Sequence, residues 1–198
     1  MKNLAVLVLA AGKSSRMKSI KQLEKINNKT LIEITLETAK KVTPKNIFCV
    51  LGANAKKIQK EISIKDVQII YNKNFESGLS SSIVAGVHHF KNEKLKFDGI
   101  LILLADQPAI TVFYLQSLID KFNLNPTKIV ASVYHHNYGV PVIIPQCYFT
   151  DLLDLKGDRG AKHFLMNHKE CIIISKTNAN LVDLDSKEDL DFYKNQIK

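Results

Sequence analysis

Residues 4–17 read Leu-Ala-Val-Leu-Val-Leu-Ala-Ala-Gly-Lys-Ser-Ser-Arg-Met, and this stretch decides the fold. Its apolar first half predicts a fully buried β-strand over residues 4–9. The small residues at 10–12 come next, where a backbone without bulky side chains can approach a ligand closely. Lys13, Arg16 and backbone N–H groups could then surround phosphate groups. An ordinary polar loop after a strand is the competing interpretation, and these residues alone do not decide between the two.

The positions of the glycines exclude two common phosphate-binding loops. A P-loop needs a glycine five residues before Gly12, and that position holds Leu7. The dinucleotide-binding fingerprint needs a second glycine soon after the first, and none occurs within residues 13–17. The stretch therefore belongs to neither class of loop.

Strand-like and helix-like patterns alternate along almost the whole chain. The expected strands cover residues 4–9, 46–51, 67–71, 99–104, 128–134, 140–144, 171–175 and 180–184. The expected helices cover residues 30–42, 54–62, 79–90, 111–122, 147–153, 161–167 and 186–195. This alternation predicts a three-layer, Rossmann-like α/β fold with a mostly parallel central sheet and helices on both faces. No linker interrupts it, so we expect a single domain over residues 1–198, with ligands beyond the carboxyl ends of the strands.

Composition narrows the choice of partners. The chain has 198 residues and a formal net charge of +9, which predicts attraction to anions. Its 28 basic residues are scattered without a nucleic-acid-binding motif, so we expect small polyanions rather than nucleic acid. No apolar run reaches the roughly 18 residues that span a bilayer. The apolar residues 4–11 are better explained as a buried strand than as a signal peptide, so we expect a cytoplasmic protein with no membrane partner and three reduced cysteines.

Asp106 and Lys21 are candidates for a site that binds metal and phosphate. Asp106 directly follows the most hydrophobic expected strand, at 99–104, where a carboxylate that holds magnesium would stand. The alternative is that it only forms a turn. Lys21 lies five residues after Arg16 and could reach the same phosphates if the chain doubles back, or it could belong to a solvated basic face.

Other possible metal ligands occur near the C-terminal end and as histidine pairs. If residues 180–184 form a strand, Asp183 and Asp185 would lie on one face of it. They could then join Asp106 in a carboxylate cluster. The alternative is that each of them only caps a helix or carries a surface charge. The adjacent histidines at 88–89 and 135–136 project in different directions and have no third ligand at a suitable spacing. We therefore expect no zinc site.

Two glycine-containing segments could face a ligand. Gly78-Leu79-Ser80-Ser81-Ser82 stands at an expected helix start, where N–H groups and the helix dipole could receive an anion or a polar base. Helix capping by serine is the alternative. Gly157-Asp158-Arg159-Gly160-Ala161 is bracketed by glycines, and taken alone it indicates only a turn.

Together and in this order, these segments resemble the nucleotidyltransferases of the molybdenum cofactor family, and within it the cytidylyltransferases. The likeness extends from residue 4 to about residue 192. It is carried by Leu9-Ala10-Ala11-Gly12, Ser14-Ser15-Arg16-Met17, Lys21-Gln22-Leu23, Gly78-Leu79-Ser80-Ser81-Ser82, Leu104-Ala105-Asp106-Gln107-Pro108, Gly139-Val140-Pro141, Gly157-Asp158-Arg159-Gly160-Ala161 and the run from Asp183 to Leu190. Each motif is short, and it is their order that makes the resemblance specific.

The resemblance implies a role for each segment. Arg16 and Lys21 would be catalytic and would contact the phosphates of CTP. Asp106, also catalytic, would hold Mg²⁺ together with Asp185. Asp183 could hold the ion instead of Asp185. The nucleotide-binding residues that it implies are Leu9, Ala10, Ala11, Gly12, Lys13, Ser14, Ser15, Arg16, Lys21, Gly78, Ser80, Ser81, Ser82 and Asp106. The residues that it places near a pterin substrate are Gly139, Pro141, Gly157, Asp158 and Gly160.

The resemblance also implies the reaction. The terminal phosphate of molybdopterin or of molybdenum cofactor would attack the α-phosphorus of CTP and expel pyrophosphate, and a molybdenum hydroxylase would receive the cytosine dinucleotide. A phosphate monoester is already nucleophilic at neutral pH, so the protein would contribute positioning and charge neutralisation. Two alternatives stay open. One is another nucleotidyltransferase of this fold, which uses GTP or acts on a sugar or alcohol phosphate, and the other is a non-enzymatic protein that binds a nucleotide or delivers the cofactor.

Several positions bear on the finer assignment. Ala11 stands where the guanylyl branch carries glycine, and its methyl group would narrow the space beside the loop in favour of a pyrimidine. Lys18 replaces the usual glycine, Ile20 replaces a frequent proline, and Ser186-Lys187 replaces Thr-Pro. We therefore expect a loop of somewhat different shape, although no residue assigned to chemistry is lost.

Overall fold

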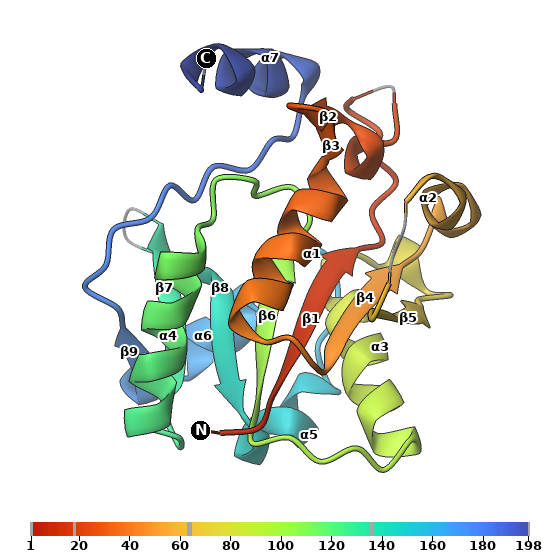
Figure 1. Cartoon of the computed structure of the whole chain (residues 1–198). Coiled ribbons are helices and arrows are strands. Elements are labelled where there is room, and N and C mark those ends of the chain that lie inside the picture. The colour runs from red at the N-terminus through yellow and green to blue at the C-terminus, as the bar shows by residue number, and fades with distance from the viewer. Residues whose placement is uncertain (1, 18, 63–64, 135–136, 198) are drawn as a thin grey trace.

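The computed structural model describes residues 2–17, 19–62, 65–134 and 137–197 (Figure 1). Within these residues, seven strands form one sheet in the order β5-β4-β1-β6-β8-β7-β9. The bounds of these strands are β1 (Leu4–Ala10), β4 (Ile47–Leu51), β5 (Gln68–Tyr71), β6 (Gly99–Leu104), β7 (Ile129–Tyr134), β8 (Asn137–Pro145) and β9 (Ile172–Ile174). A separate small hairpin pairs β2 (Lys25–Ile26) with β3 (Lys29–Thr30).

The sheet is mostly parallel, as the sequence predicts. The four neighbours β5, β4, β1 and β6 run parallel, while β8 is antiparallel to both β6 and β7, and β9 is parallel to β7. β1 lies between β4 and β6, and all seven of its residues are buried, which explains its unbroken apolar sequence. The loop that follows Ala10 therefore starts in the middle of the sheet, where the chain leaves room for a ligand.

Helices cover both faces of this sheet, so the predicted three layers are confirmed. One face carries α1 (Leu31–Val42), α2 (Ala55–Glu61) and α4 (Val112–Leu124), and the other carries α3 (Leu79–Asn92), α5 (Phe149–Leu152) and α6 (Lys162–Asn167). Alternate side chains of β1 enter the two layers, with Val6 and Val8 in the first and Ala5 and Leu7 in the second. Short 3₁₀ turns lie at Lys21–Leu23, Phe75–Ser77, Gln146–Tyr148 and Lys169–Cys171.

The last helix, α7 (Lys187–Gln196), packs outside these two layers. It stands with the hairpin at the end of the molecule to which β1 points (Figure 1). Ser186 and Asp189 form a capping box at its start. Its buried Leu190 joins a third apolar cluster, which also contains Met17, Ile26, Leu31 and Leu184. Because Met17 lies in the loop after β1, this cluster ties the C-terminal helix to that loop.

Two sequence predictions are wrong. Residues 180–184 form no strand, because this segment lies beside the sheet and bonds elsewhere: the N–H of Leu184 donates to the carbonyl oxygen of Asp106 at 3.0 Å. Residues 137–139, predicted as part of a loop, instead extend β8 and pair with β7. His135 and His136 lie outside the described residues. No helix in the described part of the chain is long and apolar enough to cross a membrane.

Candidate active site

The loop after β1 is shaped by a buried glutamine. Gln22 is 4% exposed and donates hydrogen bonds to the carbonyl oxygens of Ala10 and Gly12, at 3.1 and 3.2 Å. Its side-chain oxygen accepts a bond from the hydroxyl of Ser14, and that hydroxyl accepts one from the backbone N–H of Lys21. Ser14 itself adopts the left-handed conformation, with φ of 60°. The chain therefore doubles back after the loop, which places Lys21 beside it.

A cavity of about 500 Å³ opens at the carboxyl ends of β1 and β6. It is lined by Leu9, Ala10, Ala11, Gly12, Lys13, Ser14, Ser15, Arg16, Lys21, Gln22, Phe75, Glu76, Gly78, Leu79, Ser82, Leu104, Ala105, Asp106, Asp158, Asp183 and Asp185. Most of the residues that the sequence assigns to a nucleotide site therefore meet in one place. Residues from as far apart as Leu9 and Asp185 contribute to its wall.

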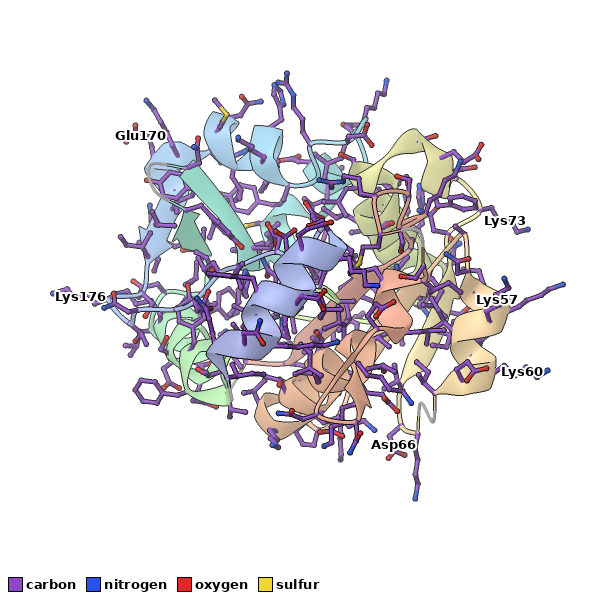
Figure 2. All side chains as sticks on the ribbon, turned by 90° about the horizontal axis from the view of Figure 1, so that it is seen from above. Lys57, Lys60, Asp66, Lys73, Glu170 and Lys176 are labelled. Atoms are coloured by element: carbon purple, nitrogen blue, oxygen red, sulfur yellow. The ribbon has the colours of Figure 1, made fainter. Side chains whose placement is uncertain are left out.

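The charge of the cavity differs from that of the whole protein. Among the described residues, five acidic and three basic side chains line it, in a chain whose net charge is +9. The surplus lysines lie on the outside, where Lys57, Lys60 and Lys73 extend away from the molecule (Figure 2). These three lysines therefore contribute to the net charge without facing the cavity.

Lys21 lies at the centre of the charged end of the cavity. Its ammonium group is 2.5 Å from Oδ2 of Asp106 and 2.8 Å from Oδ1 of Asp185, and Arg16 contacts Oδ2 of Asp185 at 2.9 Å. The side chains of Lys21 and Asp106 are only 15% and 20% exposed. Burial alone would lower the pKa of Lys21, but the charge of Asp106 and hydrogen bonds to both carboxylates raise it. The structure thus brings together the four residues that the resemblance assigns to phosphates and metal.

Asp183 faces the same cavity but has a different partner. Gln107, which is 3% exposed, donates from Nε2 to Oδ1 of Asp183 at 2.8 Å and also to the hydroxyl of Tyr134. Burial raises the pKa of the Asp183 carboxyl above its usual value. Tyr134 in turn donates to the carbonyl oxygen of Val140. A buried polar chain therefore links Asp183 to the strand residues before Pro141.

The two glycine-containing segments dock onto each other. The N–H of Ser80 donates to the carbonyl oxygen of Gly157 at 3.1 Å, and the Ser80 hydroxyl donates to the carbonyl oxygens of Lys156 and Gly160. Gly78 has φ of 90°, and a side-chain carbon there would lie 2.6 Å from backbone atoms of Gly157. Only glycine fits this contact. The docked pair presents Gly78, Ser82 and Asp158 to the cavity.

Several predicted contact residues do not line the cavity. Ser80 is fully buried in the docking contact just described, and Ser81 instead bonds to Asn72 and to the carbonyl oxygen of Gly78. These two side chains therefore do not face the cavity, and their contact with a nucleotide stays a prediction. The glycines of the second segment, Gly157 and Gly160, shape its turn, with φ of 76° and 53°.

Gly139 and Pro141 lie away from this cavity as well. Pro141 is buried in β8, where its carbonyl oxygen accepts a hydrogen bond from Ser132, and Gly139 packs beside the ring of Tyr134. Their predicted approach to a pterin is therefore not seen in the cavity lining. Val140, which lies between them, is linked to Asp183 at the cavity by hydrogen bonds through Tyr134 and Gln107.

The position of Ala11 changes the explanation of base choice. Ala11 is 5% exposed, and its methyl carbon lies beside Gly52 at the end of β4. A side-chain carbon on Gly52 would come within 2.9 Å of it. The methyl group therefore packs against the protein, so it affects the loop position rather than narrowing the cavity directly.

Sequence reasoning missed the residues that hold the site in place. Gln22 and Gln107 adjoin the assigned Lys21 and Asp106 and differ from surface glutamines only by their burial, which a single sequence does not reveal. Glu76 was also missed, and it pairs with Lys13 at 2.6 Å across the cavity. Within the described residues, no group of three or more histidine, cysteine or acidic side chains is arranged to hold a metal ion by itself.

The model of the MobA-like NTP transferase domain family matches residues 6–171, which include the loop, Lys21 and Asp106. The chain belongs to this family. This MobA-like transferase is 29% identical over 201 residues to the purine catabolism protein PucB of Bacillus subtilis, covering 94% of this chain and 93% of PucB. It is also 28% identical over 143 residues to the bifunctional protein GlmU of Francisella tularensis, covering 71% of this chain but only 30% of GlmU.

Solved structures agree with the family. A homologue of Mycobacterium tuberculosis Rv0371c from Mycobacterium sp. strain JC1 superposes with a TM-score of 0.84 and 25% identity, covering 98% of this chain and 96% of that one. A complex of Rv0371c with manganese superposes with a TM-score of 0.81 and 21% identity. CMP:2-keto-3-deoxy-manno-octonic acid synthetase with CTP superposes with a TM-score of 0.74 and 15% identity. Both alignments cover 98% of each chain. The MobA-like chain is therefore a nucleotidyltransferase with the expected fold.

The family match ends before two of the cavity carboxylates. Asp183 and Asp185 lie beyond residue 171, as does α7. In this MobA-like transferase the two carboxylates reach the cavity because Leu184, which lies between them, is held in place. Its N–H donates a hydrogen bond to the Asp106 carbonyl oxygen, and its side chain is buried in the third apolar cluster.

Proposed function

We propose that the whole chain acts as one domain that transfers CMP from CTP to the terminal phosphate of molybdopterin or molybdenum cofactor. The products are pyrophosphate and the cytosine dinucleotide form, which a molybdenum hydroxylase would receive. One observation carries the proposal: Arg16, Lys21, Asp106 and Asp185 meet at one end of a cavity that the loop after β1 lines, in a member of the MobA-like family. The molybdenum substrate is supported by the sequence motifs.

The residues of the chain would bind and orient the triphosphate. Arg16 and Lys21 offer charge-assisted hydrogen bonds to phosphate oxygens, which hold the α-phosphorus in line with the incoming phosphate. Space above Gly12 is open, since a side-chain carbon there would meet nothing within 4 Å. One P–O bond then forms from the acceptor phosphate to the α-phosphorus, while the bond to the pyrophosphate oxygen breaks and its electron pair leaves with pyrophosphate.

The carboxylates fit a divalent metal ion, and we propose Mg²⁺. Oδ1 of Asp106 is buried and has no hydrogen-bond partner among the described residues, so it offers a free ligand oxygen. The acidic lining also means that a triphosphate needs additional positive charge. Asp106 and Asp185 would hold the ion, with Asp183 as the alternative, and phosphate oxygens and waters would complete its shell. Bound there, the ion would neutralise charge on the phosphates. The manganese complex of Rv0371c supports a metal in this fold.

The choice of CTP rests on fewer observations. The sequence Leu9-Ala10-Ala11-Gly12 resembles the cytidylyl branch, and a synthetase of the same fold holds CTP. Because the Ala11 methyl packs against Gly52, any effect on the base would act through the position of the loop backbone. A group that accepts a hydrogen bond from the cytosine amino group would separate CTP from UTP.

Pyrophosphate release tests the proposal. CTP, GTP, ATP and UTP are supplied in turn to the purified chain, with and without molybdopterin. We expect release only with the pterin, and kcat/KM for CTP at least about tenfold above that for GTP. In a competition between CTP and GTP, a product rich in the guanine dinucleotide would remove the cytidylyl assignment. Release with a sugar or alcohol phosphate instead would indicate another transferase, and pterin binding without release would indicate a delivery protein.

A further inference from the structure

Two carboxylates from distant parts of the chain share one ammonium group. Lys21 lies within 2.8 Å of an oxygen of Asp106 and of Asp185, and Arg16 occupies the second oxygen of Asp185. Asp106 and Asp185 are 79 residues apart in the sequence, by their numbers, and reach each other only because residues 180–185 run past the end of β6. The chain's own cations therefore neutralise and hold together the pair proposed to bind a metal.

A divalent ion cannot bridge Asp106 and Asp185 while Lys21 and Arg16 stay, because they occupy both oxygens of Asp185 and Oδ2 of Asp106. Mg²⁺ binds carboxylate oxygens at about 2.0–2.1 Å, so an ion shared by the two carboxylates would occupy the space that the ammonium nitrogen now fills. Two cations so close together would also repel each other strongly in a partly buried site. The metal and Lys21 are thus competitors for the facing oxygens, Oδ2 of Asp106 and Oδ1 of Asp185, while Oδ1 of Asp106 has no partner among the described residues.

We propose that Lys21 is an exchangeable counter-ion, which keeps divalent metal away from Asp106 and Asp185 until a nucleoside triphosphate draws the ammonium group onto its phosphates. This inference rests on the proposed function, which supplies the triphosphate and the metal. The lysine stem is flexible, and its ammonium lines the same cavity as the loop that would receive the phosphates. Metal and nucleotide should therefore bind together, and metal alone should bind poorly.

The test measures Mn²⁺ binding to the purified full chain without nucleotide, from the loss of the free Mn²⁺ signal in electron paramagnetic resonance. Wild type should bind weakly, and Lys21→Met at least about tenfold more tightly because the competing charge is gone. Lys25→Met is the matched control: it removes an exposed lysine four residues away and should stay within about twofold of wild type. Adding Asp106→Asn to Lys21→Met should abolish the gain.

Equal Mn²⁺ affinity in wild type and Lys21→Met would overturn the proposal, and so would an equal gain in Lys25→Met, which would indicate a general charge effect. If Lys21→Met does not fold, Lys21→Gln replaces it. A second measurement uses wild type alone, with a non-hydrolysable CTP analogue. After subtraction of the Mn²⁺ that the analogue binds by itself in solution, the affinity of the protein for Mn²⁺ should be at least about tenfold higher with the analogue than without it. No such coupling would also overturn the proposal. Because no readout uses turnover, a chain that releases no pyrophosphate from any triphosphate would refute the proposed function separately.

Discussion

The backbone N–H of Leu184 donates a hydrogen bond of 3.0 Å to the backbone carbonyl oxygen of Asp106. This bond fixes the C-terminal segment beside the end of β6 and places Asp183 and Asp185 at the cavity. The Leu184 side chain is fully buried in the same cluster as Met17, which lies in the loop after β1. The C-terminal segment therefore supports the loop and the carboxylates together.

Shortening Leu190 should loosen this segment while the sheet stays folded. The Leu190 side chain is 1% exposed in the third apolar cluster. Leu190→Ala removes most of this side chain, which should lower the free energy of unfolding by about 2–5 kcal/mol. We expect clearly weaker CTP binding, measured by titration. Phe192→Ala is the control, because Phe192 lies on the same helix but is 66% exposed. Equal CTP affinity in Leu190→Ala and wild type would show that the loop does not depend on α7.

Asp106→Asn should nearly abolish turnover while the fold survives. The change keeps the side-chain volume but removes the negative charge that faces Lys21 and is proposed to hold the metal. Pyrophosphate release and thermal unfolding are measured together, with the exposed Asp66→Asn as the control for the same chemical change. Activity above about a tenth of wild type, a barrier change under about 1.4 kcal/mol, would contradict the role of Asp106.

Asp185 should make the site sensitive to acid. Burial alone would raise the pKa of its carboxyl, but hydrogen bonds and charges from Lys21 and Arg16 outweigh burial and hold the pKa below its usual 3.8. A carboxyl with a lowered pKa contributes stability above its unfolded value, and that contribution is lost as pH falls through the folded value. We therefore expect Asp185→Asn to be less stable than wild type at neutral pH, with a difference that shrinks below about pH 4.

Unfolding midpoints of both proteins between pH 3 and pH 7 check this expectation. Asp191→Asn, at an exposed position on α7, serves as the control and should show no such pH-dependent difference. A gap between Asp185→Asn and wild type that is the same at both ends of the range would mean that the ion pairs of Asp185 do not stabilise the protein.

The fold could be predicted because its signals are local. The apolar run of β1, the run of β6 and the capping box of Thr30 and Glu33 each specify an element through a few neighbouring residues. Residues 180–184 misled the prediction because three of the five, Leu181, Val182 and Leu184, are apolar, as in a short strand. Their backbone partner is Asp106, and no short-range pattern indicates a bond across that distance.

The sequence predicted which charged residues of the candidate site lie together, but not the contacts that hold them there. Motif order located Lys21, Asp106 and Asp185, and the structure brings them together. The docking of Ser80 onto Gly157 could not be foreseen, because a serine at a helix start looks the same whether it faces a ligand or a neighbouring turn. Burial and tertiary hydrogen bonds decide between these uses, and both arise only when the chain folds.

Alanine at two cavity glycines should have opposite effects. Gly12→Ala adds a methyl group that meets no protein atom within 4 Å, so the fold should be as stable as wild type, while CTP binding weakens about tenfold because the methyl stands where phosphates approach. Gly78→Ala places a carbon 2.2 Å from Oδ1 of Asp158 at φ of 90°, which should cost about 1–3 kcal/mol of stability. Thermal unfolding and CTP titration of both variants separate the two effects. Wild-type CTP affinity in Gly12→Ala would place the phosphates elsewhere in the cavity, and an unchanged midpoint in Gly78→Ala would mean that the two docked segments can move apart without cost.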